Sequence, residues 1–211
     1  MIWKKKLLSN SKLYLILDAA VADYDRLFFI ATQALKGGVD LLQLRDKYGC
    51  ARDILNAAGK LRKLSDSKKA LLIINDRIDL ALAIGADGVH LGQEDIPLTV
   101  ARTLIPKGFV IGISCQSLAQ ARAAQREGAD YIGFGSVFKT LTKPNREPMD
   151  LKLLADVVRH ARVPVFAIGG ITGQNISQLI DLDVKRVAIC RDICLAEDVC
   201  QATSNLKKEL I

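Results

Sequence analysis

The feature that most limits the fold of this chain is a succession of short apolar runs separated by segments with helical periodicity. Eight runs have this character: Leu13–Leu17, Val39–Leu44, Leu71–Ile74, Gly88–Leu91, Phe109–Ile113, Tyr131–Phe134, Val165–Ile168 and Arg186–Ile189. Most are nearly continuous in apolar residues, as expected for strands that are covered on both faces. The segments between them repeat apolar residues at helical spacing, for example across residues 27–35. The pattern predicts an α/β protein with a parallel sheet.

A weak internal repeat favours an even number of strand–helix units. Residues 37–40, 85–87 and 128–130 each close a helix with glycine and open a strand with aspartate, and residues 182–184 echo this without glycine. Eight units in 211 residues fit a (β/α)8 TIM barrel better than an open doubly wound sheet. The chain contains no GxGxxG or GxxxxGK[ST] motif. We therefore predict a single TIM-barrel domain over residues 1–211, with an N-terminal extension (1–12) and a C-terminal helix (197–211).

Composition narrows the class of partner. The net charge is +7, but much of the excess lies at the chain ends, and aromatic residues, at 5%, are too few for base-stacking surfaces. We expect anionic small-molecule substrates and no nucleic-acid partner. No signal peptide or membrane-spanning run is evident. Five cysteines without a CxxC pair indicate reduced thiols and a cytoplasmic location. The sequence does not indicate an oligomeric state.

Chemistry in such barrels lies at the carboxyl ends of the strands, so the residues that follow each strand are the candidates for function. These are Gln43, Arg45, Asp46 and Lys47 after the second strand, Asn75 and Asp76 after the third, Gln93, Glu94 and Asp95 after the fourth, Ser114, Cys115 and Gln116 after the fifth, Ser136 and residues 139–143 after the sixth, Gly169 and Gly170 after the seventh, and Cys190 and Arg191 after the eighth. Cations and glycines gathered on one rim favour a substrate that carries phosphate.

Asp76 and Asp95 follow neighbouring strands and are expected to face each other. Two such carboxylates repel unless a cation or a shared proton lies between them, which suggests a metal site. They could equally be N-caps of the helices that follow, and spacing alone leaves both interpretations open. His90 lies inside a strand, which favours a packed core histidine over a catalyst. A rim rich in cations and poor in bases points to a reaction limited by departure of an anionic leaving group.

Six stretches carry a resemblance to a known family: QLRDK (43–47), INDRIDLALAIGADGVHLGQED (74–95), GIS (112–114), GADYIGFGSVF (128–138), TLTK (140–143) and AIGGI (167–171). In this order they resemble thiamine-phosphate synthases. The resemblance implies a barrel that joins 4-amino-5-hydroxymethyl-2-methylpyrimidine pyrophosphate to a thiazole phosphate, with thiamine monophosphate and pyrophosphate as products. It also implies a dissociative reaction through a pyrimidine methylene cation.

The resemblance also implies roles for individual residues. Asp76 and Asp95 look like Mg²⁺ ligands. The pyrimidine pyrophosphate would contact Gln43, Leu44, Arg45, Asp46, Lys47, Asn75, Ser114 and Lys143. The thiazole phosphate would contact Thr140, Leu141, Thr142, Gly170, Cys190 and Arg191. Within these sets, Arg45, Lys47, Ser114 and Lys143 would act in catalysis by stabilising the departing pyrophosphate.

The chain departs from the family pattern at three places. Gln116 stands where the family often has histidine, Arg191 replaces a small residue, and Pro144–Met149 lacks the usual glycine. Two alternatives remain. Thiazole tautomerases resemble this family but carry a histidine after the sixth strand, where this chain has Ser136, and lack the second metal acid, here Asp95. A non-catalytic binder of phosphorylated thiamine precursors would not need both acids and three cations.

Overall fold

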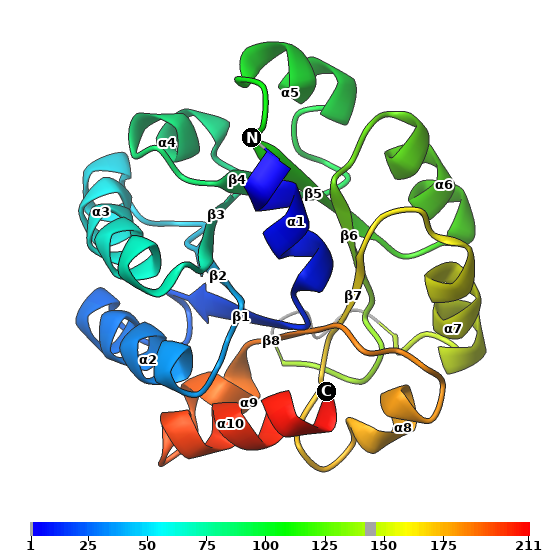
Figure 1. The fold of residues 1–211 in the computed structure, drawn as a ribbon. Helices are drawn as coiled ribbons and strands as arrows, with labels where there is room; N and C mark the ends of the chain where they lie inside the picture. Colours follow the sequence, from blue (N-terminus) through cyan, green and yellow to red (C-terminus); the bar gives the residue numbers. More distant parts are fainter. Residues whose placement is uncertain (1, 142–146) are drawn as a thin grey trace.

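Eight parallel strands form a closed barrel, in which each strand pairs with the next along the chain and β8 pairs with β1 (Figure 1). The structure, a computed structural model, describes residues 2–141 and 147–211. The strands are β1 (Leu13–Asp18), β2 (Leu41–Arg45), β3 (Leu71–Asn75), β4 (Gly88–Leu91), β5 (Val110–Cys115), β6 (Tyr131–Phe134), β7 (Val165–Ile168) and β8 (Val187–Ile189). The predicted (β/α)8 barrel is confirmed, with strand ends that differ by at most two residues from those expected.

Most of the helices surround this barrel (Figure 1). In the described residues they are α1 (Ile2–Asn10), α2 (Tyr24–Lys36), α3 (Ala51–Lys68), α4 (Ile78–Ala83), α5 (Leu98–Leu104), α6 (Leu118–Arg126), α7 (Leu151–His160), α8 (Ser177–Ile180), α9 (Arg191–Cys194) and α10 (Val199–Glu209). Helix α2 shows why they pack there, since Leu27, Ile30, Ala31 and Ala34 recur at helical spacing and are all buried. In the part of the chain that the structure describes, no helix is both long and apolar enough to cross a membrane.

The apolar residues form two layers. The larger layer lies between the strands and the outer helices. The smaller one fills the barrel interior and includes three rings, Tyr14, Tyr131 and Phe166. These rings meet edge to face with centroids 5.5–5.8 Å apart. The interior is therefore a packed core with polar phenol groups inside it.

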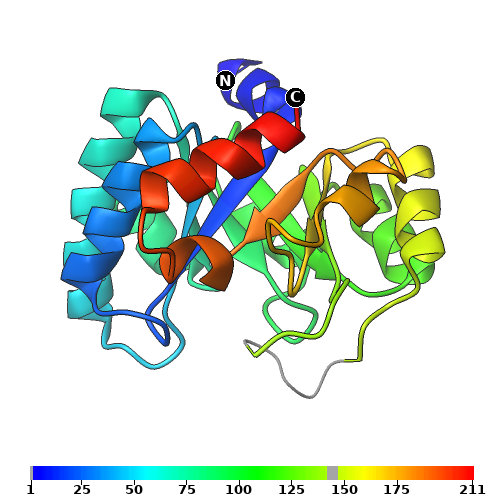
Figure 2. The same cartoon turned by 90° about the horizontal axis from the view of Figure 1, so that it is seen from below.

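Helix α1 closes the amino-terminal end of the barrel, opposite the loops that follow the strands (Figure 2). Leu8 enters the interior layer and is 2% exposed. Lys4 Nζ lies 2.8 Å from Asp87, and Lys5 Nζ lies 3.0 Å from Asp130. Two lysines of the basic N-terminal segment are thus paired with acids at the base of the barrel.

The aspartates of the internal repeat tie neighbouring strands together. Asp40 accepts hydrogen bonds from the backbone N–H groups of Lys12 and Leu13. Asp87 accepts from the N–H of Leu72 in β3, and Asp130 accepts from the N–H of Ile111 in β5. In the fourth repeat Asp183 takes the left-handed conformation of the missing glycine, with φ 61°. The fourth repeat thus keeps the left-handed residue that ends the helix, but it does not keep the aspartate that bonds to a neighbouring strand.

Candidate active site

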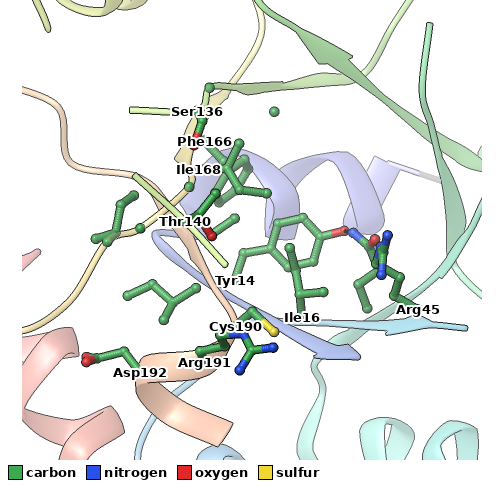
Figure 3. Close-up of a pocket in the computed structure, with 18 of the residues that line it drawn as sticks. Tyr14, Ile16, Arg45, Ser136, Thr140, Phe166, Ile168, Cys190, Arg191 and Asp192 are labelled. Carbon is green, nitrogen blue, oxygen red and sulfur yellow. Dashed lines mark hydrogen bonds between the residues drawn. The ribbon is translucent and has the colours of Figure 1, made fainter. Parts of the chain in front are cut away.

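A cavity of about 280 Å³ opens at the carboxyl ends of the strands (Figure 3). Its inner wall is formed by Tyr14, Ile16, Phe166, Ile168 and Ala188, residues of β1, β7 and β8. Polar groups from β2 to β5 line one side, and the loops after β6, β7 and β8 line the other. An apolar base with polar groups at its mouth suits an aromatic molecule that carries an anionic group.

The cavity brings together many of the predicted site residues. Those that line it are Gln43, Arg45, Asn75, Ser114, Thr140, Leu141, Gly170, Cys190 and Arg191. Thr142 and Lys143 lie outside the described residues. These residues converge although they come from six different strands or the loops that follow them, because parallel strands place all their carboxyl ends at one rim.

Arg45 is held at the cavity by a residue that the sequence survey did not select. Its Nη1 donates to Asp18 Oδ2 over 2.6 Å, and Asp18 at the end of β1 is 2% exposed. The other Asp18 oxygen accepts from the Ala20 N–H at 3.0 Å. A buried, doubly bonded carboxylate keeps the guanidinium in one place.

Asn75 offers an unused donor. Its side chain is 8% exposed and lines the cavity, and its buried Nδ2 has no hydrogen-bond partner among the described residues. A buried amide without a partner is costly, so a bound acceptor would restore the missing hydrogen bond.

Gly169 and Gly170 form part of the cavity wall, and neither position has room for a side chain. A Cβ on Gly170 would lie 2.3 Å from the Lys139 carbonyl oxygen, and one on Gly169 would lie 2.1 Å from Ser136 Oγ. Both residues also have a positive φ, which is 106° at Gly169 and 65° at Gly170. These glycines let the backbone after β7 come close to whatever fills this part of the cavity.

Asp76 and Asp95 are in contact at the tips of β3 and β4. Burial raises the pKa of Asp95, the Gly92 N–H at 2.6 Å lowers it, and a hydrogen bond shared with Asp76 raises it again. Lys47 Nζ lies 2.8 Å from the Asp76 carboxylate. The pair is therefore an oxygen-rich, negatively charged site with one cation beside it.

The alternative role of these acids, as helix N-caps, is not what the structure shows. The N-cap positions of α4 and α5 are Arg77 and Pro97, and neither helix has a side-chain cap. Asp76 instead adopts φ 58°, an uncommon conformation for a residue with a side chain. An outlier of this kind at a cavity rim is typical of a residue held in place for function.

Three other predicted residues lie away from the cavity wall. Leu44 is 1% exposed and packs in the outer apolar layer. Asp46 accepts hydrogen bonds from Tyr24 Oη at 2.5 Å and from the N–H groups of Tyr48 and Gly49. Lys47 pairs with Asp76 and is absent from the cavity lining. Asp46 thus shapes the loop that carries Lys47.

The sequence survey missed several lining residues. Tyr14 and Ile16 belong to β1, which the survey of strand ends did not cover, Thr172 lies in the loop after β7, and Asp192 lies in α9. Ser136 and Lys139, which the survey did include, line the cavity too, and Ser136 donates to the Phe138 carbonyl oxygen at 2.8 Å. Alternation along β1 could have identified the first two, because Tyr14, Ile16 and Asp18 share one face of the strand.

Comparison with known proteins decides the family. A family model described as thiamine monophosphate synthase matches residues 13–193. The chain belongs to this family.

Two family members and one solved structure match this chain over most of their length. A thiamine-phosphate synthase of Clostridium acetobutylicum is 41% identical over 188 residues, which is 89% of each chain. One from Coprothermobacter proteolyticus is 38% identical over 208 residues and covers 99% of each. The solved thiamine phosphate pyrophosphorylase of Pyrococcus furiosus superposes with a TM-score of 0.87 at 36% identity and covers 98% of this chain and 96% of that one.

Membership of the thiamine monophosphate synthase family confirms the predicted activity. It makes the chain a transferase of thiamine biosynthesis that acts on small molecules. Neither a tautomerase nor a non-catalytic binder is needed to account for the cavity.

Proposed function

We propose that the cavity joins a pyrimidine pyrophosphate to a thiazole phosphate, with release of pyrophosphate. The observation that carries the proposal is the contact between the Asp76 and Asp95 carboxyls. Lys47 lies on one side of it, and Asn75, whose Nδ2 has no partner among the described residues, precedes Asp76 in the sequence. Such a grouping of acids and cations suits a polyphosphate leaving group and has no evident use in simple binding of an aromatic ring.

Mg²⁺ fits the two acids. In the described residues no cluster of three or more His, Cys, Asp or Glu side chains forms a complete protein cage for a metal. Mg²⁺ does not require one, because it commonly keeps several waters and binds through one or two carboxylates together with substrate phosphates. Burial and then the hydrogen bond and negative charge of Asp76 raise the pKa of Asp95, and a cation between the two carboxyls would offset their repulsion. Bound Mg²⁺ would neutralise charge on the pyrophosphate.

The residues around Asp76 and Asp95 would bind the pyrophosphate leaving group. Arg45, the last residue of β2, is held by Asp18, and Lys47, two residues later, is held by Asp76. We assign Lys143 the same role, from its position in the family motif. Asn75 and Ser114 would donate hydrogen bonds. Each of these interactions strengthens as negative charge builds on the departing oxygens, which is the property required of a group that lowers the barrier.

The carbon–oxygen bond would break before the new bond forms. The methylene carbon then carries positive charge, which the amino group of the pyrimidine ring delocalises, and the thiazole nitrogen attacks this carbon. No strong protein base is needed. The described cavity residues agree, since the imidazole of His90 is engaged at both nitrogens, by Tyr131 and Ser114.

The thiazole phosphate would occupy the opposite side of the cavity. There Thr140, Leu141 and Gly170 line the cavity together, and Cys190 and Arg191 begin α9. Loops after the seventh and eighth strands are where TIM barrels commonly bind phosphate. Thr142 would complete this subsite. Arg191 adds a charge that the family pattern does not require.

The proposal includes a cytoplasmic location, supported by five free thiols, and no nucleic-acid or membrane partner. The metal assignment can be tested without turnover. Isothermal titration of pyrophosphate, the product, should show binding that is at least tenfold tighter with Mg²⁺ than with EDTA. Asp76→Asn and Asp95→Asn should each remove most of that difference. Equal binding with Mg²⁺ and EDTA in the parent chain would contradict the assignment.

A further inference from the structure

A continuous path of hydrogen bonds crosses the barrel interior and ends at two of the proposed pyrimidine contacts, Gln43 and Ser114. Gln43 Nε2 lies 2.5 Å from Tyr14 Oη, and Tyr14 Oη lies 2.8 Å from Tyr131 Oη. Tyr131 Oη lies 3.0 Å from His90 Nδ1, and His90 Nε2 lies 2.9 Å from Ser114 Oγ. The path draws on β2, β1, β6, β4 and β5 in turn.

The donor at one end determines the direction of every bond. The Gln43 amide nitrogen can only donate, so Tyr14 Oη accepts and uses its single proton to donate to Tyr131. Tyr131 in turn donates to His90 Nδ1. Because Nδ1 accepts, the neutral ring carries its proton on Nε2, which donates to Ser114 Oγ. The Ser114 proton is then directed away from His90, and Ser114 lines the cavity.

Tyr131 occupies the middle of this path without reaching the cavity. Its side chain is fully buried, it is absent from the cavity lining, and it packs against Tyr14, His90 and Phe166. Burial raises the pKa of both phenols well above the ordinary value, so each keeps the proton that it must donate. Any effect of Tyr131 on substrate must therefore pass through its neighbours.

We propose that Tyr131 is a positioning residue that holds His90 in its Nε2–H tautomer and thereby presents the Ser114 hydroxyl to the substrate as a hydrogen-bond donor. With the opposite tautomer, Ser114 would donate to His90 and turn a lone pair toward the pyrophosphate. A hydrogen-bond donor at this position would stabilise the negatively charged oxygens of the pyrophosphate, whereas a lone pair would repel them. The proposal rests on the assignment of Ser114 as a contact to the leaving group.

The tautomer can be measured in the free protein. The chain has two histidines, and His160 is exposed with its Nδ1 near the Asp156 carbonyl oxygen, so a His160→Asn variant assigns the remaining signals. In ¹⁵N-histidine NMR spectra near pH 7.5, His90 should show a protonated Nε2 and an unprotonated Nδ1. A protonated Nδ1 with an unprotonated Nε2 would overturn the proposal. This result does not depend on activity, so it separates the tautomer from the proposed function.

Tyr131→Phe breaks the path and leaves the ring in place. We expect kcat to fall about tenfold, the loss of one neutral hydrogen bond, with the KM for thiazole phosphate unchanged. The His90 ¹⁵N shifts should move toward a mixture of tautomers. Thr203→Val is the matched control, since it removes a fully buried hydroxyl that bonds the Val199 carbonyl oxygen in α10, away from the cavity. If Tyr131→Phe keeps the kcat of this control, or leaves the His90 shifts unchanged, Tyr131 has no positioning role.

Discussion

Asp18 and Arg45, at the ends of adjacent strands, form an ion pair with 2.6 Å between Asp18 Oδ2 and Arg45 Nη1. Asp18→Asn keeps the shape of the side chain but removes the charge that holds the guanidinium. A charged hydrogen bond contributes about 1.5–3 kcal/mol, so kcat/KM for the pyrimidine pyrophosphate should fall about ten- to a hundredfold. Steady-state kinetics measures this.

The control for Asp18 is Asp25→Asn, which removes an exposed acid that pairs with Lys60 over 3.3 Å. Exposed ion pairs contribute little, so this variant should behave as the parent chain does. Equal kinetics for Asp18→Asn and Asp25→Asn would show that Arg45 does not depend on its buried partner.

Arg191 is predicted to bind the thiazole phosphate. Its side chain and that of Asp192 point in different directions at the cavity (Figure 3). Within the described part of the chain Arg191 forms no ion pair, and its buried Nε has no hydrogen-bond partner. Arg191→Ser should raise the KM for thiazole phosphate about ten- to a hundredfold, with kcat and the KM for the pyrimidine substrate little changed. Unchanged KM values for both substrates would make Arg191 a surface residue.

Cys190 provides a chemical probe of the same subsite. Its thiol lines the cavity and shares a hydrogen bond with Cys194, which is buried. Iodoacetamide should inactivate the enzyme by alkylating Cys190, and thiazole phosphate should slow the inactivation. Cys190→Ser should resist the reagent, while Cys50→Ser, which removes an exposed thiol, should remain sensitive. Inactivation of Cys190→Ser at the parent rate would place the reactive thiol elsewhere.

Asp46 predicts a pH dependence of stability. Burial alone would raise its pKa, but hydrogen bonds from Tyr24, Tyr48 and Gly49 lower it below the ordinary value. A carboxyl whose pKa is lowered by folding stabilises the folded state at pH values above its pKa in the unfolded chain, about 3.9. This contribution is lost as the pH falls through the lower pKa of the folded state. The free energy of unfolding should therefore fall more steeply below about pH 4 in the parent chain than in Asp46→Asn. Parallel curves from urea denaturation would refute this role.

The barrel could be predicted because its signal is repeated and local. Each buried strand is an apolar run, and each helix ending before an even strand carries a residue that tolerates positive φ, such as Gly38, Gly85 and Asp183. The rim could also be predicted, since parallel strands bring Arg45, Asn75 and Asp76 to the same end of the barrel. Family motifs then suggested which of the rim residues contact substrate.

The interior of the site could not be predicted in the same way. Tyr14, Tyr131 and Phe166 lie within apolar runs, where an aromatic residue looks like any other core residue. The hydrogen bond between the two tyrosines joins strands that are far apart in sequence. Asp18 was missed because the survey of strand ends began at the second strand. Leu44 and Asp46 share a motif with Arg45 but point elsewhere, because successive residues of a strand face opposite sides.

The most direct measurement is the reaction itself. The purified chain is incubated with both phosphorylated substrates and Mg²⁺, and thiamine monophosphate and pyrophosphate are quantified over time. We predict equal amounts of the two products, which stop forming when EDTA is added or when Asp76→Asn replaces the parent chain. No thiamine monophosphate from the parent chain with both substrates and Mg²⁺ present would contradict the account.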